Sequence, residues 1–327
     1  MMYDAAAIGE LLIDFSCDSV SAEGYPTMSA HPGGAPANYL AALSKFGAKT
    51  AMIAKVGGDA FGRLLVNTLS STGIDARAVT VDDDYFTTLA FVTLDAQGDR
   101  EFSFARKPGA DTQLTARELD FDLIDNSRLL HFGTLSLTAE PARSATLAAV
   151  ARAQSMGKLL SFDPNLRRPL WDDLADAKRW MLWGLEQADI VKISDEEVGF
   201  LLEIDARGAA EYIVRRYGVK LCFVTCGAEG CYFATDRHSG FTPALSGVKP
   251  VDTTGAGDIF GGSAAYAMLK MNTAPEELNA PQLAAITAFA TATAGLSTQA
   301  HGGISSVPEY SSVLEHIAPE HRKYFEQ

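Results

Sequence analysis

A short run of small residues that ends in an acid is the part of this chain best suited to do chemistry. Gly255, Ala256 and Gly257 precede Asp258, and residues 259 to about 270 are apolar and alanine-rich, as in a buried helix. A glycine turn that opens such a helix presents unpaired N–H groups and the positive end of the helix dipole, which bind anions. A carboxylate beside a phosphate is repulsive, so Asp258 needs its own role. A base that deprotonates a hydroxyl, while the N–H groups hold a transferring phosphoryl group, would provide one.

The same run also has a plain structural interpretation, because acidic residues are common in the first turn of a helix. A second segment favours the chemical interpretation. Residues 32–38 read Pro-Gly-Gly-Ala-Pro-Ala-Asn and open another alanine-rich amphipathic stretch at 39–46. Asn38 offers a donor and an acceptor to neighbouring hydroxyls, although an Asn at a helix start can also be just a cap.

Together the two segments resemble the paired N-terminal and C-terminal motifs of the PfkB-type (ribokinase-like) sugar kinases, and the first is most similar to the fructokinase branch. The resemblance runs from about residue 9 to about residue 308. Two long motifs in this order and separation are more specific than one glycine motif. The resemblance implies a ribokinase-like three-layer αβα fold with a mostly parallel central sheet and a small β-sheet lid. It also implies ATP-dependent phosphorylation of a primary hydroxyl of a monosaccharide.

The resemblance assigns one set of residues to the sugar. The family places an acceptor for a sugar hydroxyl at Asp14, and the segment from Phe104 to Arg106 resembles the fructokinase segment whose arginine reaches the sugar. Taken without the family, Asp14 could be a turn residue and Arg106 a solvated surface charge. The expected sugar-binding residues are Asp14, Gly33, Gly34, Asn38, Phe104, Arg106 and Asp258.

A second set is assigned to the nucleotide and to catalysis. Residues 163–167 match the family's Asp-Pro-Asn-x-Arg motif, and Ser194 stands where many relatives have Asn, as in the Lys-x-Ser-x-x-Glu of fructokinases. A serine there could equally be a helix cap. The expected nucleotide-binding residues are Lys192, Ser194, Thr225, Gly227, Gly230, Gly255, Gly257 and Thr291, and the expected catalytic residues are Gly255, Ala256, Gly257, Asp258 and Arg167.

Metal ions follow from the same resemblance. The expected cofactors are ATP and Mg²⁺, with Glu197 organising the magnesium through water, because Mg²⁺ keeps part of its hydration shell. A monovalent cation such as K⁺ is expected near Asp252 and Thr254, where the family often binds one.

Composition narrows the class of protein. The chain has 327 residues, of which 47% are hydrophobic and 21% charged, as in an ordinary globular enzyme. Its net charge of −14 disfavours nucleic acid and anionic membranes as partners. A membrane-spanning run and a basic N-terminal leader are both missing from the sequence, so we expect a cytoplasmic protein. The four cysteines, Cys17, Cys222, Cys226 and Cys231, have no zinc-knuckle spacing and are expected to be reduced thiols, the last three of them buried.

Apolar strand patterns alternate with helical ones, which favours a mostly parallel sheet covered on both faces. Strands are expected at 5–13, 51–56, 129–132, 159–162, 190–193 and 222–225, and helices at 62–72, 141–156, 171–187, 195–202 and 206–217. Ligands bind beyond the carboxyl ends of such strands. Residues expected at or soon after these ends are Asp14, Gly133, Asp163, Ser194 and Gly227.

Two stretches break the alternation. Residues 15–30 are polar and irregular, and 78–106 predict antiparallel strands at 86–94 and 100–105, joined by a turn at 95–98. The resemblance implies that segments at about 15–32 and 78–106 form a lid that excludes water from the sugar. The alternative is an ordinary edge hairpin. We expect one kinase domain over residues 1–327, and a homodimer formed through the lid.

Fructose, converted to fructose 6-phosphate, suits the residue 32–38 and 104–106 segments best. Ribose, 2-keto-3-deoxygluconate and aminoimidazole riboside are the alternatives, and a non-catalytic sugar-binding regulator is a further one. An oxidoreductase would need a Gly-x-Gly-x-x-Gly turn after the first strand, which is missing here. Among the histidines, His131 is expected in the core and His31 in a solvent loop.

Overall fold

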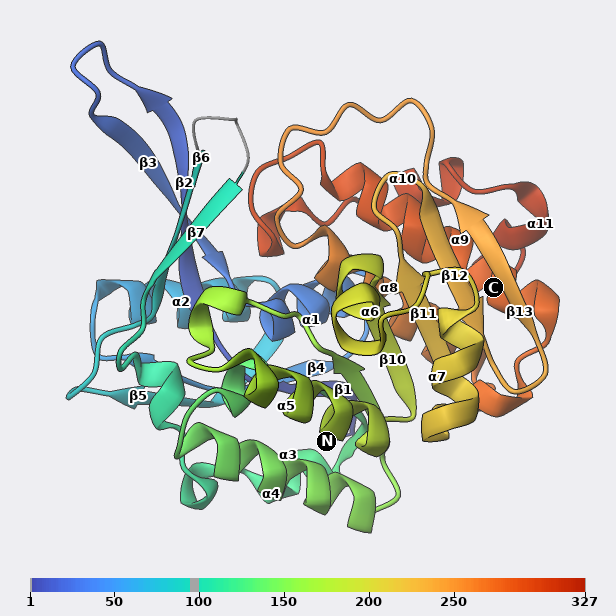
Figure 1. The fold of residues 1–327 in the computed structure, drawn as a ribbon, viewed down its shortest axis with the longest axis horizontal. Coiled ribbons are helices and arrows are strands. Elements are labelled where there is room, and N and C mark those ends of the chain that lie inside the picture. Colours follow the sequence, from blue (N-terminus) through green and yellow to red (C-terminus); the bar gives the residue numbers. More distant parts are fainter. Residues whose placement is uncertain (1, 95–99, 327) are drawn as a thin grey trace.

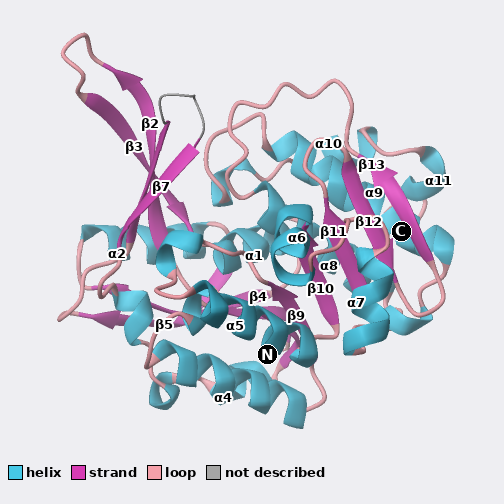
Figure 2. Cartoon of the chain, in the orientation of Figure 1, coloured by secondary structure: helices cyan, strands magenta, loops and turns pink. Residues whose placement is uncertain are grey.

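The molecule has a layered body from which a small sheet stands out on one side (Figures 1 and 2). The computed structural model describes residues 2–94 and 100–326. Nine strands form the main sheet in the order β13-β12-β11-β10-β9-β8-β1-β4-β5, and all pairings are parallel except those of β12 with its two neighbours. These strands are β1 (Tyr3–Ile8), β4 (Thr50–Gly57), β5 (Ile74–Asp82), β8 (Ser127–Gly133), β9 (Leu159–Asp163), β10 (Ile190–Ser194), β11 (Leu221–Thr225), β12 (Gly230–Ala234) and β13 (Ser239–Pro243).

Helices cover both faces of this sheet, because alternate residues of its strands are buried on opposite sides. Ala5 and Ala7 of β1 belong to one hydrophobic core, and Ala6 and Ile8 belong to the other. The first core is completed by α1 (Ala35–Lys45), α2 (Ala60–Ser71), α8 (Ala256–Met271), α9 (Ala280–Ser297), α10 (Tyr310–Glu315) and the segment beyond α11 (Pro319–Arg322). The second is completed by α3 (Phe121–Asp125), α4 (Ala142–Ser155), α5 (Leu174–Gln187), α6 (Asp195–Leu202) and α7 (Ala209–Tyr217). The predicted three-layer αβα fold is confirmed.

The small sheet has four strands in the order β3-β2-β6-β7 and rises from the body at the upper left of Figure 1. Its strands are β2 (Leu12–Val20), β3 (Pro26–Gly33), β6 (Leu89–Leu94) and β7 (Arg100–Ala105). Two strands therefore come from each predicted lid segment. The expected turn at 95–98 lies outside the described residues.

Several expectations about this region are corrected. Residues 5–13 are not one strand: β1 ends at Ile8, and the chain enters the lid as β2 after Gly9, whose φ of +153° breaks the strand. Asp14 therefore lies in a lid strand rather than at the end of a body strand. The segment at 78–82 belongs to β5 of the main sheet, so the second lid segment starts at Leu89. Residues 15–30 are mostly paired β-strand, and His31 lies half-buried in β3 rather than in a solvent loop.

Other expectations hold. His131 is buried in β8, and burial lowers its pKa to about 3, so it stays neutral. All four cysteines are free; Cys222, Cys226 and Cys231 are buried, and burial raises the pKa of the thiols of Cys222 and Cys231. Within the described ranges, the helices are all too short or too polar to cross a bilayer.

Candidate active site

A polar cavity of about 250 Å³ lies at the carboxyl edge of the central strands, beneath the lid. In the sheet, β1 lies between β4 and β8, and the strand order runs in opposite directions on its two sides. Parallel sheets bind ligands at the carboxyl edge beside such a switch point. The lining residues of the cavity come from the lid, the strand ends and the start of α8. They are Glu10, Leu12, Asp14, Gly34, Ala35, Asn38, Phe104, Leu135, Asn165, Arg167, Lys192, Ser194, Glu197, Thr253, Thr254, Gly255, Gly257 and Asp258.

Asp258 lies in the first turn of α8, and its side chain is buried. Asn38, in the first turn of α1, donates a hydrogen bond from Nδ2 to Oδ2 of Asp258 over 2.9 Å. Burial raises the pKa of Asp258, while this hydrogen bond and the charges of Lys192 and Arg167 act in the opposite direction. The site therefore holds a carboxylate that is more basic than an ordinary aspartate, next to an amide that fixes its orientation.

Glycines give α8 an open N-terminus. Gly255 caps the helix in the left-handed conformation, with φ of +76°, which favours glycine. A Cβ on Gly257 would lie 2.9 Å from Nζ of Lys192, so a cation stands directly against the first turn. The N–H groups of this turn and the Lys192 ammonium together form a site for an anion.

Lys192 lies on β10 and forms an ion pair with Asp163 at the end of β9, with Nζ 3.0 Å from Oδ2. Burial alone would lower the pKa of Lys192, but the carboxylates of Asp163, Glu197 and Asp258 raise it to about 12. The lysine is therefore charged at neutral pH. Asn165, two residues after Asp163, has φ of +45°, an uncommon conformation that turns the chain toward the cavity.

Glu197 orders two segments of the cavity wall. With Ser194 it forms a capping box at the start of α6: Ser194 Oγ accepts from the Glu197 N–H, and Oε2 of Glu197 accepts from the Ser194 N–H over 2.9 Å. Its other oxygen, Oε1, accepts from the Leu166 N–H over 2.7 Å. The carboxylate thus joins β10 to the Asp-Pro-Asn-Leu-Arg segment, and Arg167, the last residue of that segment, lines the cavity.

The lid side of the cavity contains two further carboxylates. Burial raises the pKa of Asp14 to about 7, opposed by the charge of Arg167. Burial likewise raises the pKa of Glu10 to about 7, and Oε1 of Glu10 accepts from the Ala35 N–H over 3.0 Å. A Cβ on Gly34 would lie 2.5 Å from the carbonyl oxygen of Glu10, so only glycine lets these segments touch. Gly33 packs against Asp14 behind this contact.

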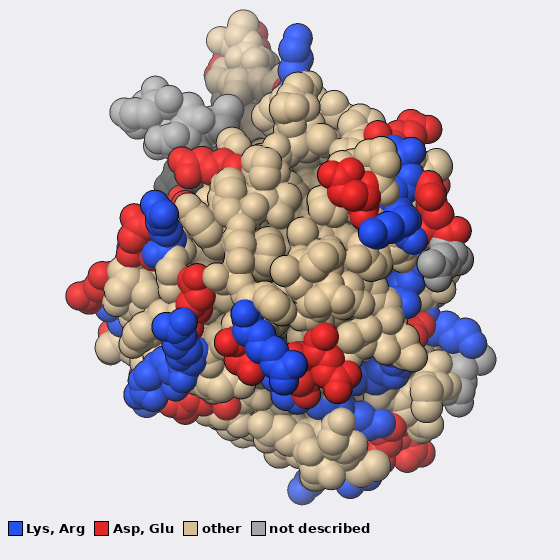
Figure 3. All heavy atoms as spheres, turned by 90° about the vertical axis from the view of Figure 1, so that its right-hand side faces the viewer, with Lys and Arg blue, Asp and Glu red and all other residues tan. Residues whose placement is uncertain are grey.

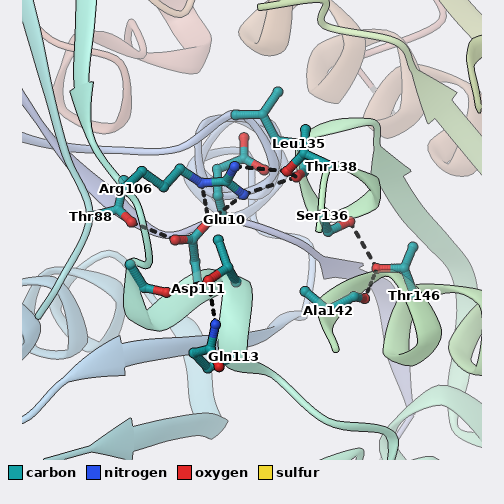
Figure 4. Close-up of polar contacts among 12 residues, drawn as sticks. Glu10, Thr88, Arg106, Asp111, Gln113, Leu135, Ser136, Thr138, Ala142 and Thr146 are labelled. Carbon is teal, nitrogen blue, oxygen red and sulfur yellow. Dashed lines mark hydrogen bonds and ion pairs between the residues drawn. The ribbon is translucent and has the colours of Figure 1, made fainter. Parts of the chain in front are cut away.

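Phe104 in β7 and Arg106 just after it were both predicted to bind the sugar, but only one of them lines the cavity. Phe104 lines the cavity, as expected. Arg106 instead lies behind the wall, where Asp111, Thr138 and the Leu135 carbonyl bind its guanidinium (Figure 4). The predicted contact of Arg106 with a sugar therefore does not follow from its position in this structure.

A second, more apolar cavity of about 400 Å³ lies on the other side of the α8 N-terminus. Five of the predicted nucleotide residues line it: Thr225, Gly227, Gly230, Gly257 and Thr291. The rest of its wall is mostly apolar and includes Leu245, Val248, Pro250, Phe260 and Gly295. Thr253 and Gly257 line both cavities, so the anion site lies between a polar chamber and an apolar one.

Asp252 connects this region to the loop after α9. Its Oδ1 accepts from the Thr254 N–H over 2.9 Å, and its Oδ2 accepts from the Gly302 N–H over 3.1 Å. The neighbouring Gly303 packs against the Asn38 side chain. Within the described residues, no cluster of three or more His, Cys, Asp or Glu side chains could hold a metal by itself.

Sequence reasoning missed several lining residues. Glu10 directly follows Gly9, the glycine that breaks the first strand, and its position at a strand end could have indicated that it lines the site. Asn165 lies inside a motif that had been assigned to Arg167. The apolar lining residues Leu245, Val248 and Pro250 lie in an irregular loop with neither motif nor periodicity, so the sequence contained no signal for them.

Comparison with known proteins agrees with this geometry. The profile of the pfkB family carbohydrate kinases matches residues 2–310. Fructokinase-1 of Zea mays is 42% identical over 317 residues, which cover 95% of this chain and 96% of the relative. Fructokinase-2 of Oryza sativa subsp. japonica is 41% identical over 320 residues, which cover 95% of this chain and 93% of the relative.

Solved structures show the same likeness. The fructokinase of Xylella fastidiosa with bound ATP has a TM-score of 0.84 at 26% identity and covers 97% of this chain and 98% of its own. The fructokinase of Vibrio cholerae O395, in a form with fructose, ADP and calcium ion bound, also has a TM-score of 0.84, at 28% identity, and covers 97% and 99%. This chain belongs to the pfkB family of carbohydrate kinases.

Proposed function

We propose that the protein is a fructokinase that transfers the γ-phosphoryl group of ATP to the primary 6-hydroxyl of D-fructose. One observation supports this proposal above the others: the buried Asp258 carboxylate lines the polar cavity in the first turn of a glycine-capped helix, directly after Gly257, which lines both the polar and the apolar cavity. The plant fructokinases at about 40% identity support fructose as the substrate. The polar cavity is the proposed sugar site, and the apolar one the proposed site of the nucleotide base.

The orphaned polar atoms of the two cavities fit these ligands. Asn38, which lines the first cavity, and Thr291, which lines the second, each have a buried side-chain oxygen (Oδ1 and Oγ1) without a hydrogen-bond partner among the described residues. A buried polar atom without a partner is costly, and a bound ligand would relieve that cost. Asn38 Oδ1 is free to accept from a sugar hydroxyl, and Thr291 offers its hydroxyl to the nucleotide.

The proposed reaction needs three actions from the chain. Asp258 aligns the sugar hydroxyl and takes its proton as the new O–P bond forms and the bond from the γ-phosphorus to the bridging oxygen breaks, which releases ADP. The N–H groups at the start of α8, from Gly255 to Gly257, stabilise the negative charge on the phosphoryl oxygens, together with Lys192 and Arg167. Asp14, Gly33, Gly34 and Phe104 surround the rest of the sugar from the lid side and keep water away from the reacting hydroxyl.

Magnesium would neutralise phosphate charge, and the donor set suits an ion that keeps most of its waters. Both oxygens of Glu197 already accept from backbone N–H groups, so its remaining lone pairs would hold a metal-bound water. Ser194 lies beside it at the cavity wall. We further assign the region of Asp252 and Thr254 to a monovalent cation such as K⁺, which backbone carbonyls would bind.

Three broader assignments complete the proposal. Residues 1–327 act as one kinase domain whose lid elements are β2, β3, β6 and β7. The lid carries exposed apolar side chains, Val20 and Tyr25, so a second copy of this chain is its proposed partner. Charged residues of both signs are interspersed on the face shown in Figure 3, which together with the net charge of −14 supports a cytoplasmic enzyme of small substrates.

The test is ADP release by the purified protein with Mg-ATP and a panel of acceptors: fructose, ribose, 2-keto-3-deoxygluconate, aminoimidazole riboside and fructose 6-phosphate. Turnover with fructose at a kcat/KM far above the others is the expected result. A preference for another acceptor would contradict the choice of sugar but keep the role of Asp258. Absence of turnover with every acceptor, despite ATP binding, would contradict the proposal that this chain is a kinase.

A further inference from the structure

One buried carboxylate holds two strands of the lid at the points where they meet the body. Thr88 directly precedes β6, and its hydroxyl donates to Oδ1 of Asp111. Arg106 directly follows β7, and its Nε and Nη2 lie 2.8 and 2.7 Å from Oδ2 of Asp111. The side chains of Arg106 and Asp111 are 3% and 1% exposed, so the pair is shielded from solvent. We call Thr88, Arg106 and Asp111 the lid-root clamp (Figure 4).

The same arginine also binds the wall of the sugar cavity from behind. Its Nη2 donates to the Leu135 carbonyl over 2.9 Å and its Nη1 to the Thr138 hydroxyl over 2.8 Å (Figure 4). Leu135 lines the cavity, and so does Phe104, two residues before Arg106 on β7. A shift of the guanidinium would therefore move both sides of this wall.

The neighbourhood of the clamp is built to leave it room. A Cβ on Gly109 would lie 1.9 Å from the Thr88 hydroxyl oxygen, so this position must be glycine for Thr88 to reach Asp111. Thr87 is held separately, because its hydroxyl donates to Oδ1 of Asp59, the N-cap of α2, over 2.9 Å. Two adjacent threonines thus tie the start of β6 to two different carboxylates of the body.

We propose that Asp111 is a positioning residue for the kinase reaction, which joins Thr88 to Arg106 and so sets where the lid and its Phe104 stand relative to Leu135. This inference rests on the proposed function. A cavity wall that is not held in place binds the sugar less well and admits water to the phosphoryl group. The nucleotide cavity is lined by none of the clamp residues, so ATP binding is spared.

The experiment compares Thr88→Val, which keeps the shape but removes the hydroxyl, with Thr88→Ser, which restores the hydroxyl. The matched control is Thr287→Val in α9, where a buried threonine hydroxyl donates to the Leu283 carbonyl, far from the lid. Thr88→Val is expected to raise KM for fructose by about tenfold with kcat and KM for ATP within about twofold. It should also raise the ratio of ADP released to sugar phosphate formed. Thr88→Ser and Thr287→Val are expected to behave like the wild type.

Asp111→Asn gives a stronger test, because the amide keeps an oxygen for Thr88 but loses the charge that binds Arg106. A larger rise in sugar KM than in Thr88→Val is expected, again without a change in KM for ATP. The inference would be overturned if KM for the sugar and the ratio of ADP to sugar phosphate were unchanged in both variants. It would also be overturned if KM for the sugar and KM for ATP rose equally.

The clamp can be tested separately from the proposed kinase activity. If the wild type phosphorylates no acceptor, hydrogen exchange of the free protein still tests the clamp. Thr88→Val should then speed exchange in β6 and β7 with exchange in α9 unchanged. Unchanged exchange in these two strands would refute the clamp itself.

Discussion

Asn38 and Asp258 lie 220 positions apart in the chain, yet the Asn38 amide donates to the Asp258 carboxylate over 2.9 Å. The bond joins the first turns of α1 and α8, the two helices that follow the two sequence motifs. Both residues line the polar cavity. The hydrogen bond therefore fixes the Asp258 carboxylate at the wall of the proposed sugar site.

Asp258→Asn should lower kcat by about 10²–10⁴-fold, because the amide cannot take the proton of the attacking hydroxyl. Sugar affinity should change little, since an amide of the same shape still fits beside Asn38. Steady-state ADP release and calorimetric sugar binding would measure the two quantities. A variant with near-normal kcat would contradict the role of Asp258 as the base.

The pH profile of kcat/KM should fall on the acidic side, because the base must be ionised in the free enzyme. Burial raises the pKa of Asp258, so this limb is expected above pH ~4, where an ordinary aspartate titrates. Asp14, whose pKa is about 7, titrates in the same window. We expect the acidic limb to persist in Asp14→Asn, because Asp258 and not Asp14 is the proposed base. If kcat/KM did not change between pH 4 and pH 8 while the protein stayed folded, the raised pKa of Asp258 would be contradicted.

Thr291→Val should raise KM for ATP by about fivefold and leave KM for the sugar unchanged. The side chain keeps its shape, but the buried hydroxyl of this cavity-lining residue is lost, and one hydrogen bond contributes about 1 kcal/mol. Thr293→Val in the same helix is the control, because the Thr293 hydroxyl is already bonded to the Phe289 carbonyl. An equal effect of the two substitutions on KM for ATP would refute the assignment of Thr291 to the nucleotide.

Two adjacent glycines of α8 should respond oppositely to alanine. A Cβ on Gly262 would lie 2.1 Å from the Tyr39 carbonyl oxygen, so Gly262→Ala forces α8 away from α1 at a cost of about 1–3 kcal/mol. A Cβ on Gly261 would lie 3.4 Å from the Tyr39 ring, an ordinary contact, and alanine favours the helix by up to about 1 kcal/mol. Urea unfolding would measure both. Similar stability of the two variants would show that α8 and α1 are not packed as described.

Glu10→Gln should stabilise the protein more at pH 8 than at pH 5. The pKa of Glu10 is about 7 in the folded protein and ~4.3 in the unfolded chain, so its contribution to stability falls as pH rises through this window. Glutamine cannot ionise and escapes this loss, which amounts to about 2 kcal/mol over the interval. It also keeps an oxygen for the Ala35 N–H.

The control for this pH dependence is Glu118→Gln. The charge of Lys55, 2.7 Å from Oε1 of Glu118, and bonds from Thr115 outweigh burial and lower the pKa of Glu118. Both folded and unfolded states are then ionised above pH 5, so the effect of this substitution should be nearly the same at pH 5 and pH 8. Urea midpoints at the two pH values give the comparison, and a constant effect of Glu10→Gln would refute the raised pKa.

The alternation of strands and helices predicted the body of the fold from sequence, because each buried parallel strand is a short apolar run between longer amphipathic stretches. The helix at residues 195–202 was predicted to the residue, and in the structure a capping box of Ser194 and Glu197 marks its start. By contrast, the helix α9 was not predicted, and only its residue Thr291 was expected, as part of the nucleotide site. It is apolar all round, so it lacks the periodic face from which helices are recognised.

The site could be predicted where a motif is local and could not where it depends on tertiary contacts. The start of α8 and the Asp-Pro-Asn-Leu-Arg segment are continuous in sequence, and both line the cavity. The position of Arg106 depends on Asp111 and on the distant Leu135 carbonyl, which nothing in residues 104–106 reveals. The break at Gly9 is likewise a tertiary feature, because a Cβ there would lie 2.8 Å from Pro36.

Thr253 and Gly257 line the polar cavity on one side and the apolar cavity on the other. Two ligands that share a wall cannot bind independently if either one shifts it. Thermodynamic linkage then makes the influence reciprocal: whatever factor the nucleotide applies to sugar affinity, the sugar applies to nucleotide affinity. If either ligand shifts these two residues, the pair of chambers acts as a single cooperative unit, whose coupling free energy could be measured by titrating each ligand in the presence of the other.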